Sequence, residues 1–106
     1  MDGVLLIDKP RGVTSHDVVA ALRSATGERR VGHTGTLDPL ATGLLPIVFG
    51  QATRLASLLT AANKTYEATV ALGQSTDTDD AEGRPVGEAA VPPGDRDQIE
   101  AALCAF

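Results

Sequence analysis

The sequence predicts a protein of the α+β (mixed α/β) class, and three observations support this. Short apolar runs typical of strands alternate with segments of helical periodicity. The 106 residues correspond to one domain at most. Leu, Ile, Val and Phe number 26, about a quarter of the chain, which is enough for folding, although the absence of Trp predicts a thin core.

The first half of the chain predicts two strands, a helix and a constrained loop. Residues 3–8 are a short apolar run that ends at a turn, as in a buried strand. Residues 15–26 place apolar side chains three and four positions apart, after a Thr-Ser pair suited to capping and before a glycine, which predicts a helix. Residues 32–43 hold three glycines and a proline and are expected to form a loop. Residues 44–49 indicate a second buried strand, in which Pro46 is expected at an edge or a bulge.

The second half of the chain predicts a helix, a strand, a polar loop and a further helix. Residues 52–62 carry leucines on one helical face. Residues 65–72 alternate between apolar and polar side chains, as in a half-buried strand. A polar loop is expected over 73–83, and the Pro- and Gly-rich residues 84–94 are expected to be extended or a linker. Asp95, with Gln three residues later, is suited to start a helix with an apolar stripe.

Charge is distributed unevenly along the chain, whose net charge is −5. Residues 1–65 carry seven basic and five acidic side chains, whereas residues 66–106 carry two basic and nine acidic ones. The overall acidity argues against a nucleic-acid partner, but the basic bias of the first part leaves such a partner open beside the simpler interpretation of a solvated surface.

The sequence also indicates the cellular compartment. No apolar run approaches the ~18 residues of a membrane span, and the N-terminus lacks the pattern of a signal peptide. Cys104 is the single cysteine and cannot form an internal disulfide, so we expect a cytoplasmic protein with no membrane association.

Asp38 is the strongest candidate for chemistry. Pro39 restricts the backbone of Asp38, and the surrounding glycines allow close approach, so the carboxylate is suited to nucleophilic or acid–base work. The alternative is that Asp38 caps a turn, as Asx-Pro pairs often do. A phosphate cradle is disfavoured, because the loop lacks the Gly-Lys-Ser/Thr ending of a P-loop.

His33 and Tyr66 each allow more than one role. His33 could act as a general base, a metal ligand or a stacking platform, or it could have only a surface or capping role. No second ligand lies at metal-site spacing, and residues 77–83 lack the side chains of a calcium loop, so no metal site is expected. Tyr66 is on the apolar side of its predicted strand and could belong either to the core or to a binding site.

Four sequence blocks, spread over residues 3–83, resemble the bacterial TruB family of tRNA pseudouridine-55 synthases in their order and spacing. The blocks are GVLLIDKPRGVTSHDVV, VGHTGTLDPLATGLLPIVFGQATR, KTYEA and LGQSTDTDDAEG. The segment GHTGTLDPLATGLLP is the most specific of these matches.

The resemblance implies an enzyme that uses no cofactor and no metal and converts one uridine in the T-arm loop of tRNA to pseudouridine. It implies a mixed, largely antiparallel sheet with flanking helices, and residues 1–106 as the N-terminal portion of the catalytic domain. A thumb, the second half of the catalytic domain and a C-terminal RNA-binding domain are expected outside these residues. The 106 residues alone are therefore expected to be inactive or nearly so, and the full-length enzyme to be monomeric.

The resemblance also assigns roles to individual residues. Asp38 matches the catalytic aspartate, which acts either at C6 of the uracil ring or at C1′ of the ribose. His33 matches the residue that enters the T-loop, and Tyr66 matches the tyrosine that stacks on the target base. Asp80 matches an acidic residue in the ionic network around the catalytic carboxylate. Lys9, in the DKP motif, matches a residue that supports the active-site loop.

Two alternatives stay open beside this interpretation. Guide-RNA-dependent pseudouridine synthases share the GTLDP-type loop and would perform the same chemistry. A non-catalytic RNA-binding or folding fragment is the alternative from a different class.

Overall fold

The computed structural model describes residues 1–91 and 94–106, which form two compact units, Met1–Thr65 and Tyr66–Phe106. Helices and antiparallel strands combine within the chain, which confirms the predicted α+β class. The boundary between the units coincides with the change from a basic to an acidic balance in the sequence. No helix of the described residues is long and apolar enough to cross a membrane.

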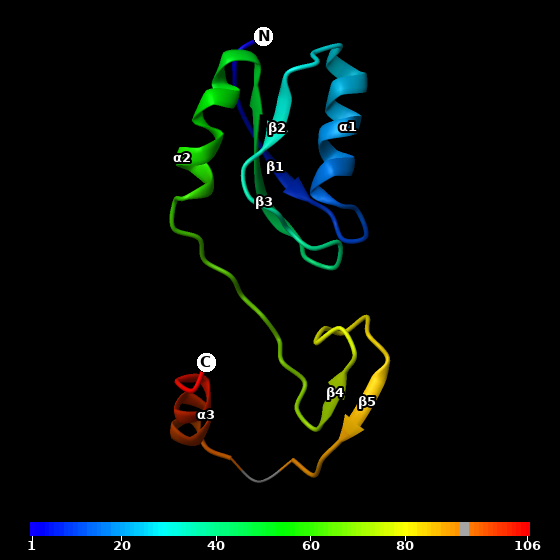
Figure 1. Ribbon diagram of the computed structural model, residues 1–106, viewed down its shortest axis with the longest axis vertical. Coiled ribbons are helices and arrows are strands. Elements are labelled where there is room, and N and C mark those ends of the chain that lie inside the picture. Colours follow the sequence, from blue (N-terminus) through cyan, green and yellow to red (C-terminus); the bar gives the residue numbers. More distant parts are fainter. Residues whose placement is uncertain (92–93) are drawn as a thin grey trace. The chain divides into compact units, whose positions relative to one another are not determined.

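The first unit is built on a three-stranded antiparallel sheet. Its strands are β1 (Gly3–Lys9), β2 (Val31–His33) and β3 (Gly43–Phe49), in the order β1-β3-β2. Figure 1 shows β3 between its two partners. The short strand β2 was not expected, because it occupies the start of the segment predicted to be a loop.

Pro46 lies in the central strand, so its expected position at an edge or bulge is wrong. It faces Leu6 of β1, and its carbonyl oxygen accepts the Thr34 N–H at 3.0 Å. The last residue pair between β2 and β3 joins His33 to Ile47. Pro46, which has no N–H to donate to a neighbouring strand, lies one position beyond this pair. The missing donor therefore falls where β2 ends, and no ladder hydrogen bond is lost within the paired segment.

The helix α1 (Ser15–Thr26) has the predicted bounds and both predicted ends. Thr14 is the N-cap: its hydroxyl accepts the Asp17 N–H at 3.0 Å, while the Asp17 carboxylate accepts the Thr14 N–H at 2.8 Å. Gly27 ends the helix in the left-handed conformation, with φ of 71°. The reciprocal pair at the start fixes the first turn of α1.

The core of the first unit lies between α1 and one face of the sheet. Figure 1 shows α1 beside this sheet. Its buried members come from α1, β2 and β3: Val19, Val31, Leu45, Ile47 and Phe49. The strand at 3–8 is confirmed, but its burial is not, because Val4 and Leu6 are exposed. β1 is an edge strand, so its apolar residues have fewer neighbours than those of β3.

The predicted helix over 52–62 is present only in its second part. A 3-10 segment η1 (Gly50–Leu55) precedes the short helix α2 (Ala56–Thr60). Leu55 and Leu58 are exposed, so the expected apolar face is not buried within the described residues.

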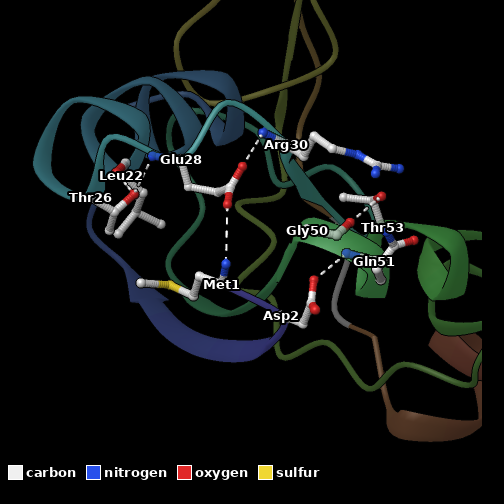
Figure 2. A network of polar contacts seen from close by, with 9 residues as sticks. All are labelled: Met1, Asp2, Leu22, Thr26, Glu28, Arg30, Gly50, Gln51 and Thr53. Atoms are coloured by element: carbon white, nitrogen blue, oxygen red, sulfur yellow. Dashed lines mark hydrogen bonds and ion pairs between the residues drawn. The ribbon is translucent and has the colours of Figure 1, made fainter.

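Polar contacts join Met1 and Asp2 to two other segments, the turn after α1 and the start of η1, as Figure 2 shows. The Met1 ammonium nitrogen lies 3.4 Å from the Glu28 carboxylate, which also accepts the Arg30 N–H at 2.9 Å. The Asp2 carboxylate accepts the Gln51 N–H at 2.5 Å and thereby caps the start of η1. Gly50 lies directly against Asp2, with φ of 56°.

We expect Gly50→Ala to lower the free energy of unfolding by about 2 kcal/mol, because alanine resists the left-handed backbone and its Cβ would overlap Asp2 and Met1. Urea unfolding followed by circular dichroism would measure the loss. Gly27→Ala is the matched control, since Gly27 has a φ of 71° but open space around its Cβ. Equal losses of unfolding free energy in the two variants would show that the close approach of Gly50 to Asp2 adds nothing to the cost of a Cβ at this position.

The second unit contains a hairpin and a helix. β4 (Gln74–Thr76) and β5 (Pro85–Glu88) pair antiparallel. β4 lies in the segment predicted to be a polar loop, and β5 lies in the segment predicted to be either extended or a linker. The helix α3 (Arg96–Leu103) starts as predicted, because the Asp95 carboxylate accepts the Gln98 N–H at 3.0 Å. The expectation that residues 84–94 are extended or a linker also covers Pro92 and Pro93, which lie outside the described residues.

The half-buried strand predicted over 65–72 is wrong. These residues form no regular structure, and Tyr66, Val70 and Leu72 are all exposed. Alternation of apolar and polar residues produces a strand only where another strand supplies hydrogen bonds and a covered face. No strand of the described residues pairs with this segment.

Candidate functional site

The candidate site is the loop that connects β2 to β3 and carries Asp38. Its second half is held by Lys9, the last residue of β1, whose side chain is completely buried. The Lys9 ammonium donates to the carbonyl oxygens of Val13 at 2.7 Å, Pro10 at 2.9 Å and Pro39 at 3.4 Å. The Gly12 N–H also donates to Pro39, at 2.7 Å. Lys9 thus ties the turn before α1 to the residue after Asp38.

The first half of the loop is held by Ser15, the first residue of α1, which is 2% exposed. The Ser15 hydroxyl donates to the Leu37 carbonyl oxygen at 3.2 Å and accepts the Leu37 N–H at 3.0 Å. The Leu37 side chain packs against the core of the first unit. The residue before Asp38 is therefore anchored through both its main chain and its side chain.

Asp38 itself lies exposed between these two anchors. Its main-chain carbonyl oxygen accepts the Ala41 N–H at 2.9 Å and closes a turn. Within residues 1–91 and 94–106, no hydrogen bond or ion pair involves its carboxylate, so the side chain does not cap the turn. The loop thus presents a carboxylate on a fixed backbone, which is the arrangement that a nucleophile or a general base requires.

His33 is half-buried at the end of β2 and points back into the loop. Its Nδ1 lies 2.7 Å from the Gly35 carbonyl oxygen, which can only accept, so Nδ1 carries the proton. The ring caps its own loop, in agreement with the capping alternative. In the neutral tautomer, this contact leaves Nε2 as an acceptor.

Tyr66 and Asp80 belong to the second unit, Tyr66–Phe106. Tyr66 is 67% exposed, so the alternative of a core tyrosine is wrong within that unit. The Asp80 carboxylate accepts the Thr78 hydroxyl at 2.7 Å and the Glu82 N–H at 2.9 Å, in the turn between β4 and β5. The structure thus brings Asp38, His33 and Lys9 together at one loop of the first unit, whereas Tyr66 and Asp80 belong to the second unit.

The turn around Asp80 predicts a dependence on acid pH. The Thr78 hydroxyl and then the Glu82 N–H hold the pKa of the Asp80 carboxyl below its usual range. Because this pKa is depressed in the folded turn, the ionised carboxylate stabilises the turn at pH values above the ordinary carboxyl pKa. This contribution is lost as the pH falls below about 4. We expect the Glu82 amide resonance to shift in that range on NMR titration. Asp80→Asn should reduce this shift, and an unchanged shift in the variant would contradict the assignment.

In the described part of the chain, no group of three or more His, Cys, Asp or Glu side chains is arranged so that it could hold a metal ion. The sequence pattern singles out Asp38 and the resemblance singles out Lys9, but neither points to Ser15 as a residue of this loop. The Ser15 position in the sequence carries no signal for its contact with Leu37, which lies 22 residues away.

The fold and the site define a small α+β protein that displays a pre-organised carboxylate on an anchored loop. A family model described as TruB family pseudouridylate synthase (N terminal domain) matches residues 23–106. The chain belongs to the TruB family, and the matching part is that family's N-terminal domain.

Curated relatives support this membership. A tRNA pseudouridine synthase B from Opitutus terrae is 49% identical over 106 residues, which cover 100% of this chain and 44% of that protein. The enzyme of the same name from Thermobifida fusca is 58% identical over 90% of this chain and 35% of its own length. That from Geobacillus thermodenitrificans is 60% identical over 78% of this chain and 28% of its own. The chain therefore spans less than half the length of these relatives.

A solved structure supports the fold. One chain in a structure of an H/ACA RNP bound to a substrate RNA containing 2′-deoxyuridine matches with 45% sequence identity and a TM-score of 0.51. The match covers 53% of this chain and 18% of the other.

Proposed function

We propose that this chain carries the catalytic aspartate of a tRNA pseudouridine synthase that acts on uridine 55 in the T-arm loop. The observation that carries the proposal is the state of Asp38, whose carboxylate is exposed and unpaired within the described residues while both neighbouring residues are anchored. Family membership supports the reaction class, and the names of the curated relatives support tRNA as the substrate.

The proposed reaction is an isomerisation, so it needs no oxidant, reductant or second substrate. The bond between N1 of uracil and C1′ of ribose breaks, the base turns over, and a bond forms between C5 and C1′, while C5 releases its proton and N1 takes one up. Ionised Asp38 would initiate this exchange by attack at C6 or by action at C1′. An exposed carboxylate can reach either atom, provided that the base is first extruded from the RNA.

The other site residues would serve base extrusion and support. Extrusion costs a few kcal/mol, and stacking on an aromatic ring returns roughly 1–3 kcal/mol per base. His33 would enter the space left in the T-loop, and Tyr66 would stack on the uracil. Lys9 would support the loop from beneath, and Asp80 would join the ionic network around Asp38.

We further propose that residues 1–106 are the N-terminal portion of the catalytic domain and require the remainder of that enzyme for turnover. The basic balance of residues 1–65 suits contact with phosphate groups, whereas the chain as a whole has a net charge of −5. The complete enzyme would work as a monomer on cytoplasmic tRNA.

Tritium release from tRNA labelled at C5 of uridine tests the proposal. The chain alone is expected to release little or no tritium. A chimera, in which the chain replaces the matching region of the Thermobifida fusca relative, is expected to release tritium from position 55. A folded chimera that binds tRNA without release would favour a non-catalytic RNA-binding fragment and would overturn the proposal.

A guide-RNA-dependent synthase is the second candidate, because the H/ACA RNP chain is 45% identical over its matched part. Identities of 48–60% to proteins named tRNA pseudouridine synthase B favour the stand-alone type. Activity of the chimera on tRNA without added RNA would decide for that type, and activity only with a guide RNA would decide for the second candidate.

A further inference from the structure

The anchor at Leu37 points to a role for Ser15 that its place in the sequence does not suggest. One hydroxyl pairs with both main-chain groups of Leu37, accepting its N–H at 3.0 Å and donating to its carbonyl at 3.2 Å. The hydroxyl is buried, since Ser15 is 2% exposed. We propose that Ser15 is a positioning residue for Asp38, an inference that rests on the proposed function.

Ser15 is itself fixed in space by the helix that carries it. It is the first residue of α1, whose opening turn is closed by the reciprocal hydrogen bonds between Thr14 and Asp17. One turn later, Val19 is buried in the core against the sheet. Because the helix start cannot follow a movement of the loop, the hydroxyl holds the Leu37 peptide groups at a constant place relative to the sheet.

This anchor matters because Asp38 has no side-chain anchor of its own within the described residues. The position of its carboxylate is set by the main chain of its two neighbours. Pro39 is held by Lys9 and Gly12, and the Leu37 side chain packs against the core, so loss of the Ser15 hydroxyl would free only the main-chain groups of Leu37 and allow the backbone to rotate there. A displacement of about 1 Å at a reacting group can lower a rate about a hundredfold.

The first test measures the anchor in the 106-residue chain by amide hydrogen exchange. Ser15→Ala is expected to raise exchange at the Leu37 amide by at least about tenfold, because its acceptor is removed. Thr26→Ala is the matched control at the opposite end of α1. The Thr26 hydroxyl also makes two main-chain hydrogen bonds, to the Leu22 carbonyl at 2.7 Å and from the Glu28 N–H at 3.2 Å (Figure 2). Its loss should leave Leu37 unchanged.

The second test measures the effect on the reaction in the chimera. Ser15→Ala is expected to lower kcat about 10- to 100-fold, with KM for tRNA within about threefold, because substrate contacts remain while the carboxylate is displaced. Ser15→Thr keeps the hydroxyl and should retain more of kcat than Ser15→Ala. Thr26→Ala should keep the kcat of the unmodified chimera.

The outcomes separate the two proposals. An unchanged Leu37 exchange rate, an unchanged kcat, or an equal loss of kcat in Thr26→Ala would each overturn the role of Ser15. If the unmodified chimera does not turn over, the proposed function fails. In that case, a raised exchange rate of the Leu37 amide in Ser15→Ala would still show that Ser15 holds the loop. An unchanged exchange rate would show that Ser15 does not hold the loop either.

Discussion

Asp38→Asn is expected to abolish tritium release by the chimera, with a loss of at least about a thousandfold in kcat. The amide has nearly the shape of the carboxylate but carries no charge and cannot act as the nucleophile. Because Asp38 is exposed and its carboxylate makes no hydrogen bond within the described residues, the substitution should leave the fold unchanged. Far-UV circular dichroism and the melting temperature would check this.

Binding separates a catalytic role from an RNA-contacting one. The dissociation constant for tRNA should change by less than about tenfold in Asp38→Asn, since removal of one negative charge beside phosphates does not weaken the contact. Asp97 carries an exposed carboxylate in the first turn of α3. Asp97→Asn is therefore the matched control and should keep full turnover. Retained tritium release by Asp38→Asn would show that another group attacks the uridine.

Lys9→Met is expected to lower the free energy of unfolding by about 3 kcal/mol, because the part-buried carbonyls of Val13 and Pro10 lose their donor and a carbonyl left unpaired away from water costs about 1–3 kcal/mol. The Lys9 ammonium serves three carbonyls, and the Gly12 N–H still serves that of Pro39 after the substitution. Met fills the volume of the stem but supplies no donor to Val13 or Pro10. For a chain of this size the melting temperature should fall by roughly 10–20 °C.

Lys64→Met is the matched control for this prediction. Lys64 is exposed, although its ammonium also donates to main-chain carbonyls, those of Thr60 and Ala62. Water can replace these hydrogen bonds, so the change in unfolding free energy should stay within about 0.5 kcal/mol. Equal melting temperatures for Lys9→Met and the unmodified chain would contradict the structural role of Lys9.

The candidate site could be predicted from the sequence only in part. The glycines and Pro39 indicate a constrained loop around Asp38, and the structure contains that loop. The sequence leaves open whether the Asp38 carboxylate caps the turn or stays free, because this depends on the path of the loop in space. The contact of Ser15 with Leu37 could not be predicted, because it joins residues 22 positions apart.

By itself, the sequence determined the elements whose causes are local. The helix α1 begins and ends where Thr14 and Gly27 predict, and α3 begins at its Asp95 cap, because capping and helical periodicity involve residues only a few positions apart. Only the tertiary structure decided which strands became neighbours. It placed Pro46 in the central strand, left β1 at an edge and gave residues 65–72 no partner strand among the described residues, because strand pairing and burial depend on segments distant in the chain.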